Sequence, residues 1–371
     1  MSRFLITDFG AVADGKTDCT AAVQKALDKA GEVRGTVVVT SGRFLCGYVK
    51  VPPFVSLVGD FSWTFYDFAG SELVLCRDDV ECMIDIKGAF GCRLDGLSIN
   101  GNNKGDGING VQLNWRDHMD ERKSYNGRED TPTISNCRIG NFSGNAVHFN
   151  NVWCFSIRHS MLCYSENGLY LNGCDAFIQD NWFSVNRKAG VLSDRGFMSG
   201  TFGGNRFECN HREGAKFNNI GYVQFNNNYW DYNRGCGFLS YGTDDTFDYR
   251  GHISFVGNIF YRDGVYDGDY YAEDSIESSH ILISDACNVI VSSNDFGMGE
   301  NQADGRKGPY YGIVYKNLCN SIISGNTMMC AAVSENIKSL GGEKGQVIVK
   351  DNVGDCFNNE KCQAFPRYSD K

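Results

Sequence analysis

The sequence lacks the segments that would carry a protein into or across a membrane. No stretch of the 371 residues approaches the roughly 18 apolar residues of a membrane span. The first residues, Met1–Asp8, show no signal-peptide pattern. Basic residues are also scarce, because 35 Lys and Arg against 45 Asp and Glu leave a net charge of −10. Since phosphate binding needs a basic surface, we expect neither a nucleic acid nor a membrane as partner.

The 16 cysteines lack the spacing of a metal or redox motif. No C-x-x-C occurs, so a zinc ribbon or a thioredoxin-type centre has no support. A chain of this length does not need disulfides, and many cysteines stand beside apolar residues, as in Trp153–Phe155 and Met161–Cys163. We therefore predict mostly buried free thiols and a cytoplasmic location, with Cys356 and Cys362 as the exceptions.

Asparagine and glycine are what the sequence has in excess. It holds 44 Gly and 34 Asn, and no Asn precedes Asn100. A frame of three short apolar strands, an Asn and a Gly turn recurs from about residue 130 to 353. Its marker positions are Asn136, His159, Asn181, Asn205, Asn228, Asn258, Asn294, Asn326 and Asn352. A period near 23 residues fits one coil of a parallel β-helix. Asn tolerates the left-handed backbone of a sharp bend, and stacked amides can hydrogen-bond from coil to coil.

The first hundred residues hold strand-like runs at Thr36–Thr40, Ser71–Leu75 and Cys82–Ile86. One helix is expected before Gly31, with Thr17 and Asp18 as caps and an apolar stripe formed by Ala21, Ala22, Val23, Ala26 and Leu27. The predicted fold is all-β: a parallel β-helix with an N-terminal α-helical cap. We expect a single domain over residues 1–371, with the strand and capping helix in 1–35, the coils in 36–353 and a tail in 354–371.

Gly10–Thr17 matches the phosphate-binding pattern G-x-x-x-x-G-K-[ST]. We reject a P-loop because the alternating strands and helices of such proteins are missing after residue 31. The longer segment Ile6–Asp18, continued by Thr20, Ala22, Gln24 and Ala26, instead resembles the N-terminal signature of the pectate lyase-like superfamily of right-handed β-helices. Gly35–Val39 and Ser41–Phe44 also fit it. Polygalacturonases, other glycoside-cleaving enzymes and phage tailspikes share that opening, so the resemblance implies a carbohydrate ligand.

Individual enzymes of that superfamily are matched less closely. Asp244–Asp245 and Gly251–Ile253 resemble polygalacturonase motifs but stand at the wrong spacing. Gly173–Phe177 and Tyr311–Tyr315 resemble segments of inulin fructotransferases, also β-helices. The glutamate which that family has after Asp175 is missing here, and Asn186 lies in its neighbourhood.

Apolar and polar residues alternate along the strand that follows each Gly, which predicts an inner and an outer face for that strand. We place Val147 and Phe149 inward, and His148 and Asn150 outward. Stacked coils then give two outward columns. One contains Gln112, His148, Tyr170, Leu192, Lys216 and Leu239, and the other contains Asn114, Asn150, Asn172, Asp194, Asn218 and Tyr241.

Four insertions, at residues 115–130, 242–250, 262–279 and 297–309, flank this strand and would wall a groove over the columns. Their aromatic and acidic residues are Trp115, Asp117, Tyr125, Asp244, Tyr249, Tyr266, Tyr270, Tyr271, Glu273 and Asp274. We predict that sugar binds to His148, Tyr170, Arg187, Arg212, Lys216, Tyr241 and Trp115. No metal and no cofactor are expected. A calcium site among Asp263, Asp267 and Asp269 stays open as an alternative, although the spacing and the closing Glu of an EF-hand are absent. His118, His252 and His280 stand alone and show no zinc pattern. The Tyr- and Phe-rich loops are compatible with a homotrimer.

The predicted function is cleavage or rearrangement of glycosidic bonds, which normally needs two carboxyl groups. We predict Asp194 and Glu213 as the catalytic pair, with Glu166, Asp175 and Asp231 in reserve. Surface ion pairs are the alternative interpretation of these acids. A polysaccharide lyase that uses Lys216, Arg187 or Arg212 as base stays open, as does an adhesin that only binds glycans.

Overall fold

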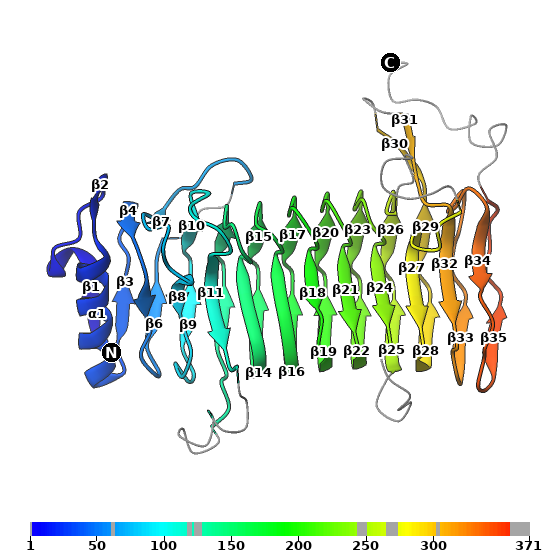
Figure 1. The fold of residues 1–371 in the computed structure, drawn as a ribbon, viewed down its shortest axis with the longest axis horizontal. Helices are drawn as coiled ribbons and strands as arrows, with labels where there is room; N and C mark the ends of the chain where they lie inside the picture. The colour runs from blue at the N-terminus through cyan, green and yellow to red at the C-terminus, as the bar shows by residue number, and fades with distance from the viewer. Residues whose placement is uncertain are drawn as a thin grey trace. The chain divides into compact units, whose positions relative to one another are not determined.

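The computed structural model describes residues 2–60, 64–116, 121, 128–242, 251–264, 274–301 and 305–356. The chain divides into two compact units, Met1–Thr201 and Phe202–Lys371, and each is described by itself. Within each unit, short parallel strands stack into three layers, so that one coil contributes a strand to each layer (Figure 1). This confirms the all-β class and the repeat. The single domain over residues 1–371 stays a prediction.

In the first unit the strands of each layer pair with the strands one coil away. The first layer contains β5 (Val49–Lys50), β8 (Cys82–Asp85), β11 (Asn109–Asn114), the first halves of β14 (Val147–Arg158) and β16 (Leu169–Gln179), and β18 (Val191–Ser193). The second layer contains β1 (Arg3–Leu5), β3 (Thr36–Val38), β6 (Ser56–Val58), β9 (Arg93–Asp95), β12 (Thr133–Ser135), the second halves of β14 and β16, and β19 (Phe197–Gly203), which runs past the end of the unit. The third layer contains β2 (Asp14–Asp18), β4 (Gly42–Cys46), β7 (Ser71–Leu75), β10 (Ser98–Asn100), β13 (Arg138–Gly140), β15 (Met161–Cys163) and β17 (Trp182–Ser184).

The second unit repeats the same arrangement. Its first layer contains β21 (Ala215–Asn218), β24 (Phe238–Tyr241), β27 (Ser279–Ser284), β32 (Tyr311–Lys316) and β34 (Glu335–Ser339). Its second layer contains β22 (Ile220–Asn226), β25 (Gly251–Val256), β28 (Cys287–Ser292), β33 (Ser321–Ser324) and β35 (Val347–Lys350). Its third layer contains β20 (Arg206–Glu208), β23 (Tyr229–Asp231), β26 (Ile259–Tyr261) and β29 (Asp295–Gly297), and β30 (Gly299–Asn301) and β31 (Gly305–Lys307) form an antiparallel hairpin.

A 3₁₀ turn, η1 (Ile6–Phe9), and a helix, α1 (Thr20–Val33), lie near the N-terminus. The helix begins at Thr20 and its N-cap residue is Cys19, so the prediction of Thr17 and Asp18 as caps is wrong. Asp18 nevertheless lies next to the start of the helix, where its Oδ1 accepts the Thr20 N–H at 2.9 Å. The helix continues past Gly31, however, and the left-handed Arg34 follows its last turn. Ala22, Val23, Ala26, Leu27 and Ala30 form its buried side. In the described part of the chain, no helix is long and apolar enough to cross a membrane.

The P-loop-like segment has no phosphate cradle, as expected. Residues 14–18 form β2, and α1 starts only at Thr20. The Asp14 carboxylate accepts the backbone N–H groups of Lys16 and Thr17 at 2.8 Å each, as well as the Thr17 hydroxyl. These bonds lower the pKa of Asp14 to about 2. The N–H groups that would bind a phosphate are therefore occupied by a carboxylate.

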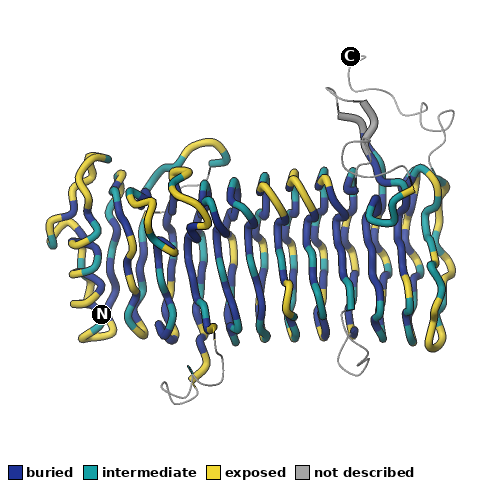
Figure 2. Tube along the Cα trace, viewed as in Figure 1, coloured by how far each residue is buried: buried dark blue, intermediate teal, exposed yellow. Residues whose placement is uncertain are grey.

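Buried residues recur along the strands of each unit (Figure 2), and their hydrophobic side chains form its core. Val147 and Phe149 have no exposed surface, which confirms the predicted inward phase. In the second unit, aromatic rings stack from coil to coil, with Phe207, Trp230, Phe260 and Phe296 in consecutive coils of the third layer. Since every coil buries a ring against the next one, the repeat itself builds the core.

Asparagine amides join neighbouring coils of the second unit, as predicted. From Asn228 onward, the Oδ1 of each ladder Asn accepts hydrogen bonds from the backbone and side-chain amides of the ladder Asn one coil earlier. The ladder runs through Asn205, Asn228, Asn258, Asn294, Asn326 and Asn352.

In the first unit the equivalent ladder positions are Cys137, Ser160 and Asn181, since Ser160 Oγ accepts the Cys137 N–H and Asn181 Oδ1 accepts the Ser160 N–H. The markers Asn136 and His159 are therefore one residue out of register. Both have left-handed backbones, with φ of 53° and 45°.

The described cysteines are mostly free thiols. Fourteen are free, including Cys356, for which we expected an exception, and Cys330 is disulfide-bonded. Cys362 lies outside the described residues. Burial raises the pKa of Cys92 and Cys137 to about 12 each, so these two thiols are inert small apolar groups. A cytoplasmic location stays a prediction.

Candidate functional site

The predicted outward columns exist in the first unit. Gln112, His148, Tyr170 and Leu192 are register partners on β11, β14, β16 and β18. Asn114 and Asn150 pair in the second column, and Asn150 Nδ2 donates to Asn114 Oδ1 at 3.0 Å. Because strands one coil apart are hydrogen-bonded neighbours, residues far apart in the sequence meet on one outer face.

His148, Tyr170 and Asp194 form a contiguous cluster on this face, which we call the His–Tyr–Asp cluster. The His148 and Tyr170 rings are stacked, with centroids 4.4 Å apart and planes 11° apart. The Tyr170 hydroxyl donates to Asp194 Oδ1 at 2.7 Å. His148 and Tyr170 are half-buried, whereas Asp194 is exposed. All three residues were predicted from the sequence, and the structure brings them into contact.

Burial keeps His148 uncharged at neutral pH. Desolvation lowers the pKa of its imidazole to about 4, although the carboxylates of Glu81 and Asp194 partly oppose this shift. Asn145 Nδ2 lies 3.1 Å from His148 Nδ1. Since an amide nitrogen can only donate, we assign Nδ1 as the acceptor and place the proton on Nε2. His148 is thus a neutral group with one N–H donor.

The tyrosine of the cluster stays protonated. Burial, and then the hydrogen bond to Asp194, raise the pKa of Tyr170 to about 12. Asn172 supports the pair, because its Nδ2 lies 2.8 Å from the Tyr170 hydroxyl and 3.2 Å from Asp194 Oδ1. Asn172 Oδ1 in turn accepts the Ser193 hydroxyl and the Arg195 N–H, each at 3.1 Å. The carboxylate and the hydroxyl are therefore held by a buried amide.

Sequence reasoning missed Glu81, an acid that interacts electrostatically with His148. Glu81 precedes β8, and Arg116 Nη2 contacts both of its carboxylate oxygens, at 3.0 and 3.1 Å. The Arg116 contact and a hydrogen bond from Gln112 outweigh desolvation and lower the pKa of Glu81. Glu81 could have been found from its position one residue before β8, a strand of the layer that carries the outward columns.

Other predicted residues of the first unit lie elsewhere. Trp115 is fully buried, and its Nε1 donates to Asp130 Oδ1 at 2.9 Å, so the prediction that it binds sugar is wrong. Arg187 donates to the backbone carbonyls of Phe142 and Ser143 at 2.8 and 2.9 Å, which ties it to a turn. Glu166 is ion-paired with Lys188.

Asp175 is exposed in a left-handed bend of β16, with φ of 59°, between the first-layer and second-layer halves of that strand. The Cys174 thiol donates to its Oδ2 at 3.3 Å. Asp175 therefore lies at a corner of the coil.

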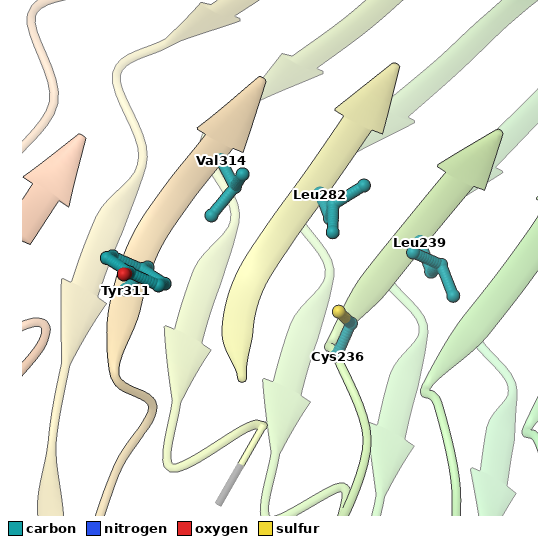
Figure 3. Close-up of a cluster of buried hydrophobic side chains, with 5 residues drawn as sticks. All are labelled: Cys236, Leu239, Leu282, Tyr311 and Val314. Carbon is teal, nitrogen blue, oxygen red and sulfur yellow. The ribbon is translucent and has the colours of Figure 1, made fainter. Parts of the chain in front are cut away.

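In the second unit, Lys216 and Leu239 are register partners, as predicted, and so are Asn218 and Tyr241. The column through Leu239 is apolar and covered there. Cys236, Leu239, Leu282, Tyr311 and Val314 form a buried cluster (Figure 3). Tyr241, Ile276, Tyr310 and Leu340 pack against it. In the second unit the predicted column therefore passes from the polar Lys216 to the apolar Leu239 cluster.

The remaining predicted residues of the second unit fall on two layers. Glu213 lies in the turn before the first-layer strand β21 and Lys216 lies on that strand, with Oε1 and Nζ 4.0 Å apart. Tyr241 donates to Glu277 Oε1 at 2.8 Å. Arg212 is exposed in the same turn as Glu213. Asp231 lies on the third-layer strand β23, where Arg262 holds it with bonds of 2.8 and 2.6 Å. Asp231 therefore does not belong to the first-layer columns for which the catalytic acids were predicted.

The walls of the predicted groove fall largely on residues that the structure does not describe: Asp117, Tyr125, Asp244, Tyr249, Tyr266, Tyr270, Tyr271 and Glu273. His118, Asp267 and Asp269 also lie outside it. Among the described residues, no three His, Cys, Asp or Glu side chains gather in a way that could hold a metal ion.

Solved structures of β-helix proteins resemble this chain over most of its length. The A-module of the mannuronan C-5 epimerase AlgE6 from Azotobacter vinelandii matches with a TM-score of 0.64 and 16% identity, covering 96% of this chain and 100% of the module. DFA-IIIase from Arthrobacter chlorophenolicus A6, without its lid and in complex with GF2, matches with a TM-score of 0.58 and 12% identity, covering 97% and 95%. The Dettilon tailspike protein matches with a TM-score of 0.60 and 14% identity, covering 94% and 68%.

These likenesses confirm the fold that the N-terminal signature implies. The chain shares the parallel β-helix fold of these solved structures. No family model and no curated protein sequence matches it. At these identities the likeness concerns the fold, so the chemistry has to be argued from the residues.

Proposed function

We propose that this protein is an enzyme that acts on the glycosidic bonds of an oligo- or polysaccharide, with Asp194 as an essential carboxylate. The observation that carries this proposal is the His–Tyr–Asp cluster, where a carboxylate accepts a hydrogen bond from a tyrosine hydroxyl beside a neutral, half-buried histidine. Perturbed pKa values at one surface site are typical of catalytic residues. A solvated sheet face needs no such arrangement.

The proteins of similar fold support a glycan as substrate. One is named a mannuronan epimerase, one was solved with GF2 bound, and others are phage tailspikes, including an enzymatically active domain. The inulin fructotransferase-like segments of the sequence agree with this class. A hydrolase or a fructotransferase-like enzyme is our first choice.

The cluster supplies part of the chemistry of glycosidic cleavage. The Asp194 carboxylate accepts hydrogen bonds from Tyr170 and Asn172, which position it to act as nucleophile or base. His148 and Tyr170 offer donors to sugar hydroxyls. Cleavage needs a second carboxyl group as acid, for which we propose Glu213. Asp194 belongs to the first unit and Glu213 to the second, so the pairing rests on the sequence argument.

A polysaccharide lyase is the second candidate. The observation in its favour is the stacked His148–Tyr170 pair, since a neutral imidazole and a protonated phenol could remove and return protons on one sugar ring. A lyase leaves an unsaturated product, a hydrolase adds water, and an internal transfer yields an anhydride. An adhesin would leave the glycan unchanged.

The test is incubation with a panel of fructans, pectins and other glycans, with product masses as readout. Once a substrate is found, Asp194→Asn should lower kcat about 100-fold or more, as loss of a positioned acid–base group does. Glu32→Gln is the matched control, because Glu32 is an ion-paired carboxylate of the same unit that no prediction places in the site. Full activity of folded Asp194→Asn would refute the proposal.

The pair is tested by making Glu213→Gln separately. If Asp194 and Glu213 act together, each single variant should lose most of the turnover while binding substrate. Retention of more than about a tenth of wild-type turnover by both variants would exclude the pair, since such groups typically supply factors of 100 or more.

We also propose that α1 closes the N-terminal end of the solenoid. Its buried side, with Leu27 and Ala30, would shield the core from water. Leu27→Asp should then cause soluble aggregates or unfolding, whereas a folded monodisperse variant would contradict the cap. A homotrimer is a further proposal, to be tested by light scattering.

A further inference from the structure

Buried side-chain amides form a hydrogen-bonded chain at the starts of the first-layer strands in the first unit. Asn109, Asn145 and Asn167 occupy equivalent positions in consecutive coils, and all three are buried. Asn167 Nδ2 donates to Asn145 Oδ1 at 2.8 Å, and Asn145 Nδ2 donates to Asn109 Oδ1 at 3.0 Å. Asn145 Nδ2 also lies 3.1 Å from His148 Nδ1, so the chain of amides reaches the His–Tyr–Asp cluster.

Backbone N–H groups fix the orientation of the Asn145 amide. A backbone N–H can only donate, so the side-chain atom that it contacts is an oxygen. The Ala189 N–H is 3.0 Å from Asn167 Oδ1, which leaves Asn167 Nδ2 to donate to Asn145 Oδ1. The Asn145 N–H is 2.9 Å from Asn109 Oδ1, so the Asn145 atom beside that same oxygen has to be the donor Nδ2. Both neighbours therefore require the same orientation, with Nδ2 toward His148.

This orientation determines where the imidazole of His148 carries its proton. One N–H of the Asn145 amide is taken by Asn109 Oδ1, and the other faces His148 Nδ1. A proton on Nδ1 would place two donors against each other, so Nδ1 is the acceptor and Nε2 carries the proton. Desolvation lowers the pKa of the ring to about 4, so it is neutral near pH 7. A neutral ring with this proton position has its lone pair on the side of Asn145.

The same chain orients a second polar group of the outer face. Asn109 Nδ2 donates to Gln112 Oε1 at 2.7 Å, which leaves the Gln112 amide nitrogen as a donor. Gln112 hydrogen-bonds to the Glu81 carboxylate, and this bond helps to lower the pKa of Glu81. The amides therefore set the donor and acceptor roles of two neighbouring side chains of one column, Gln112 and His148.

We propose that Asn145 is a positioning residue that keeps the proton of His148 on Nε2, so that the ring meets a sugar as a hydrogen-bond donor and not as a base. This role of His148 rests on the proposed action on glycans. The ligand atom at Nε2 is then an acceptor, such as a ring, glycosidic or hydroxyl oxygen. A lyase in which His148 removes a proton needs a lone pair on the side of the ring away from Asn145, where the Nε2–H stands. The proton position therefore favours hydrolysis or transfer over a lyase of this kind.

The proton position can be measured without a ligand. Wild type carrying isotope-labelled histidine is studied by long-range proton–nitrogen NMR correlation near neutral pH, and His148→Gln identifies the resonances of this ring. Nε2 should be protonated and Nδ1 unprotonated. A proton on Nδ1, or a mixture of the two tautomers, would overturn the proposal and leave the proposed role of Asp194 untouched.

Asn145→Asp tests whether this residue is responsible. A carboxylate beside Nδ1 should draw a proton to that nitrogen and raise the pKa of His148 by about 1–3 units, because a nearby opposite charge favours the charged ring. Asn141→Asp is the matched control and should change neither, since the Asn141 amide contacts Asn100 on the third layer. An unchanged tautomer and pKa in folded Asn145→Asp would overturn the role of Asn145.

Asn145→Leu serves if the Asp variant does not fold, because Leu has a similar shape and no donor. This variant should give a mixture of both tautomers of His148. Retention of the pure Nε2–H tautomer would show that something other than Asn145 holds the proton, and would overturn the proposal.

The donor role toward a sugar is tested by adding neutral fructo-oligosaccharides to the labelled wild type. The Nε2 and Nε2–H resonances of His148 should shift while Nδ1 stays unprotonated. No shift would overturn the assignment of such a sugar to this donor. Failure of the proposed function is seen separately, as glycans that keep their masses in the product panel.

Discussion

Asn258 lies in the middle of the Asn ladder, and its replacement by Ala tests how the coils of the second unit are joined. The side chain is 1% exposed. Its Oδ1 accepts the backbone and side-chain N–H groups of Asn228, both at 3.0 Å, and its Nδ2 donates to the Phe225 carbonyl at 2.8 Å and to Asn294 Oδ1 at 2.9 Å. The variant would leave two donors of Asn228 and the carbonyl of Phe225 buried without these partners.

Each such group costs about 1–3 kcal/mol, so the loss of all three partners in Asn258→Ala should lower the free energy of unfolding by about 3–9 kcal/mol. Urea unfolding followed by far-UV circular dichroism measures this as a lower midpoint at similar slope. Asn226→Ala is the control, because this half-exposed amide makes only a 3.4 Å contact to Gln224, and it should change stability by less than about 0.5 kcal/mol. A loss below about 1 kcal/mol for Asn258→Ala would refute the ladder as a source of stability.

Phe217→Ala should cost about 3–5 kcal/mol in urea unfolding, because Phe217 is fully buried among Phe202, Phe225 and Phe238, and a loss below about 1 kcal/mol would contradict its inward placement. Burial raises the pKa of Asp263, so the folded state binds its proton more tightly than the unfolded state does. The protonated carboxyl therefore stabilises the fold fully below about pH 4, and this contribution is lost as the pH rises. Asp263→Asn should therefore gain stability over wild type between pH 4 and 7 in parallel unfolding curves, and a pH-independent difference would show that Asp263 does not titrate. Trp115→Phe should destabilise by about 1–3 kcal/mol without weakening glycan binding in calorimetry, and the opposite result would restore its role as a sugar contact.

The repeat was readable because strand alternation is a local property. Val147 and Phe149 alternate with His148 and Asn150, and a period of two fixes which side chains face inward. Repetition of that pattern at a fixed phase then predicted the register partners His148 and Tyr170. The Asn ladder was predicted from the same repetition. The prediction is one residue out of register at Asn136 and His159, because a residue with a left-handed backbone stands just before the ladder position there.

The cluster around His148 was predictable only in part. Tyr170 and Asp194 followed from the columns, but their hydrogen bond depends on side-chain length and on the support of Asn172. Glu81 reaches the same histidine from a turn 67 residues earlier in the chain, where no repeat frame could be recognised.

The class of fold, the coil repeat and the inward and outward faces could be predicted from the sequence, because they follow from short-range periodicity. Whether a residue outside the alternating strands is buried depends on the tertiary structure. Trp115 follows the last residue of β11, and its turn into the core against Asp130 could not be predicted from alternation. Likewise Glu277 lies 36 residues from Tyr241, and their hydrogen bond exists because the segment after an insertion returns to the same coil face. Contacts between distant segments depend on where the backbone goes between them, which periodicity within a strand does not specify.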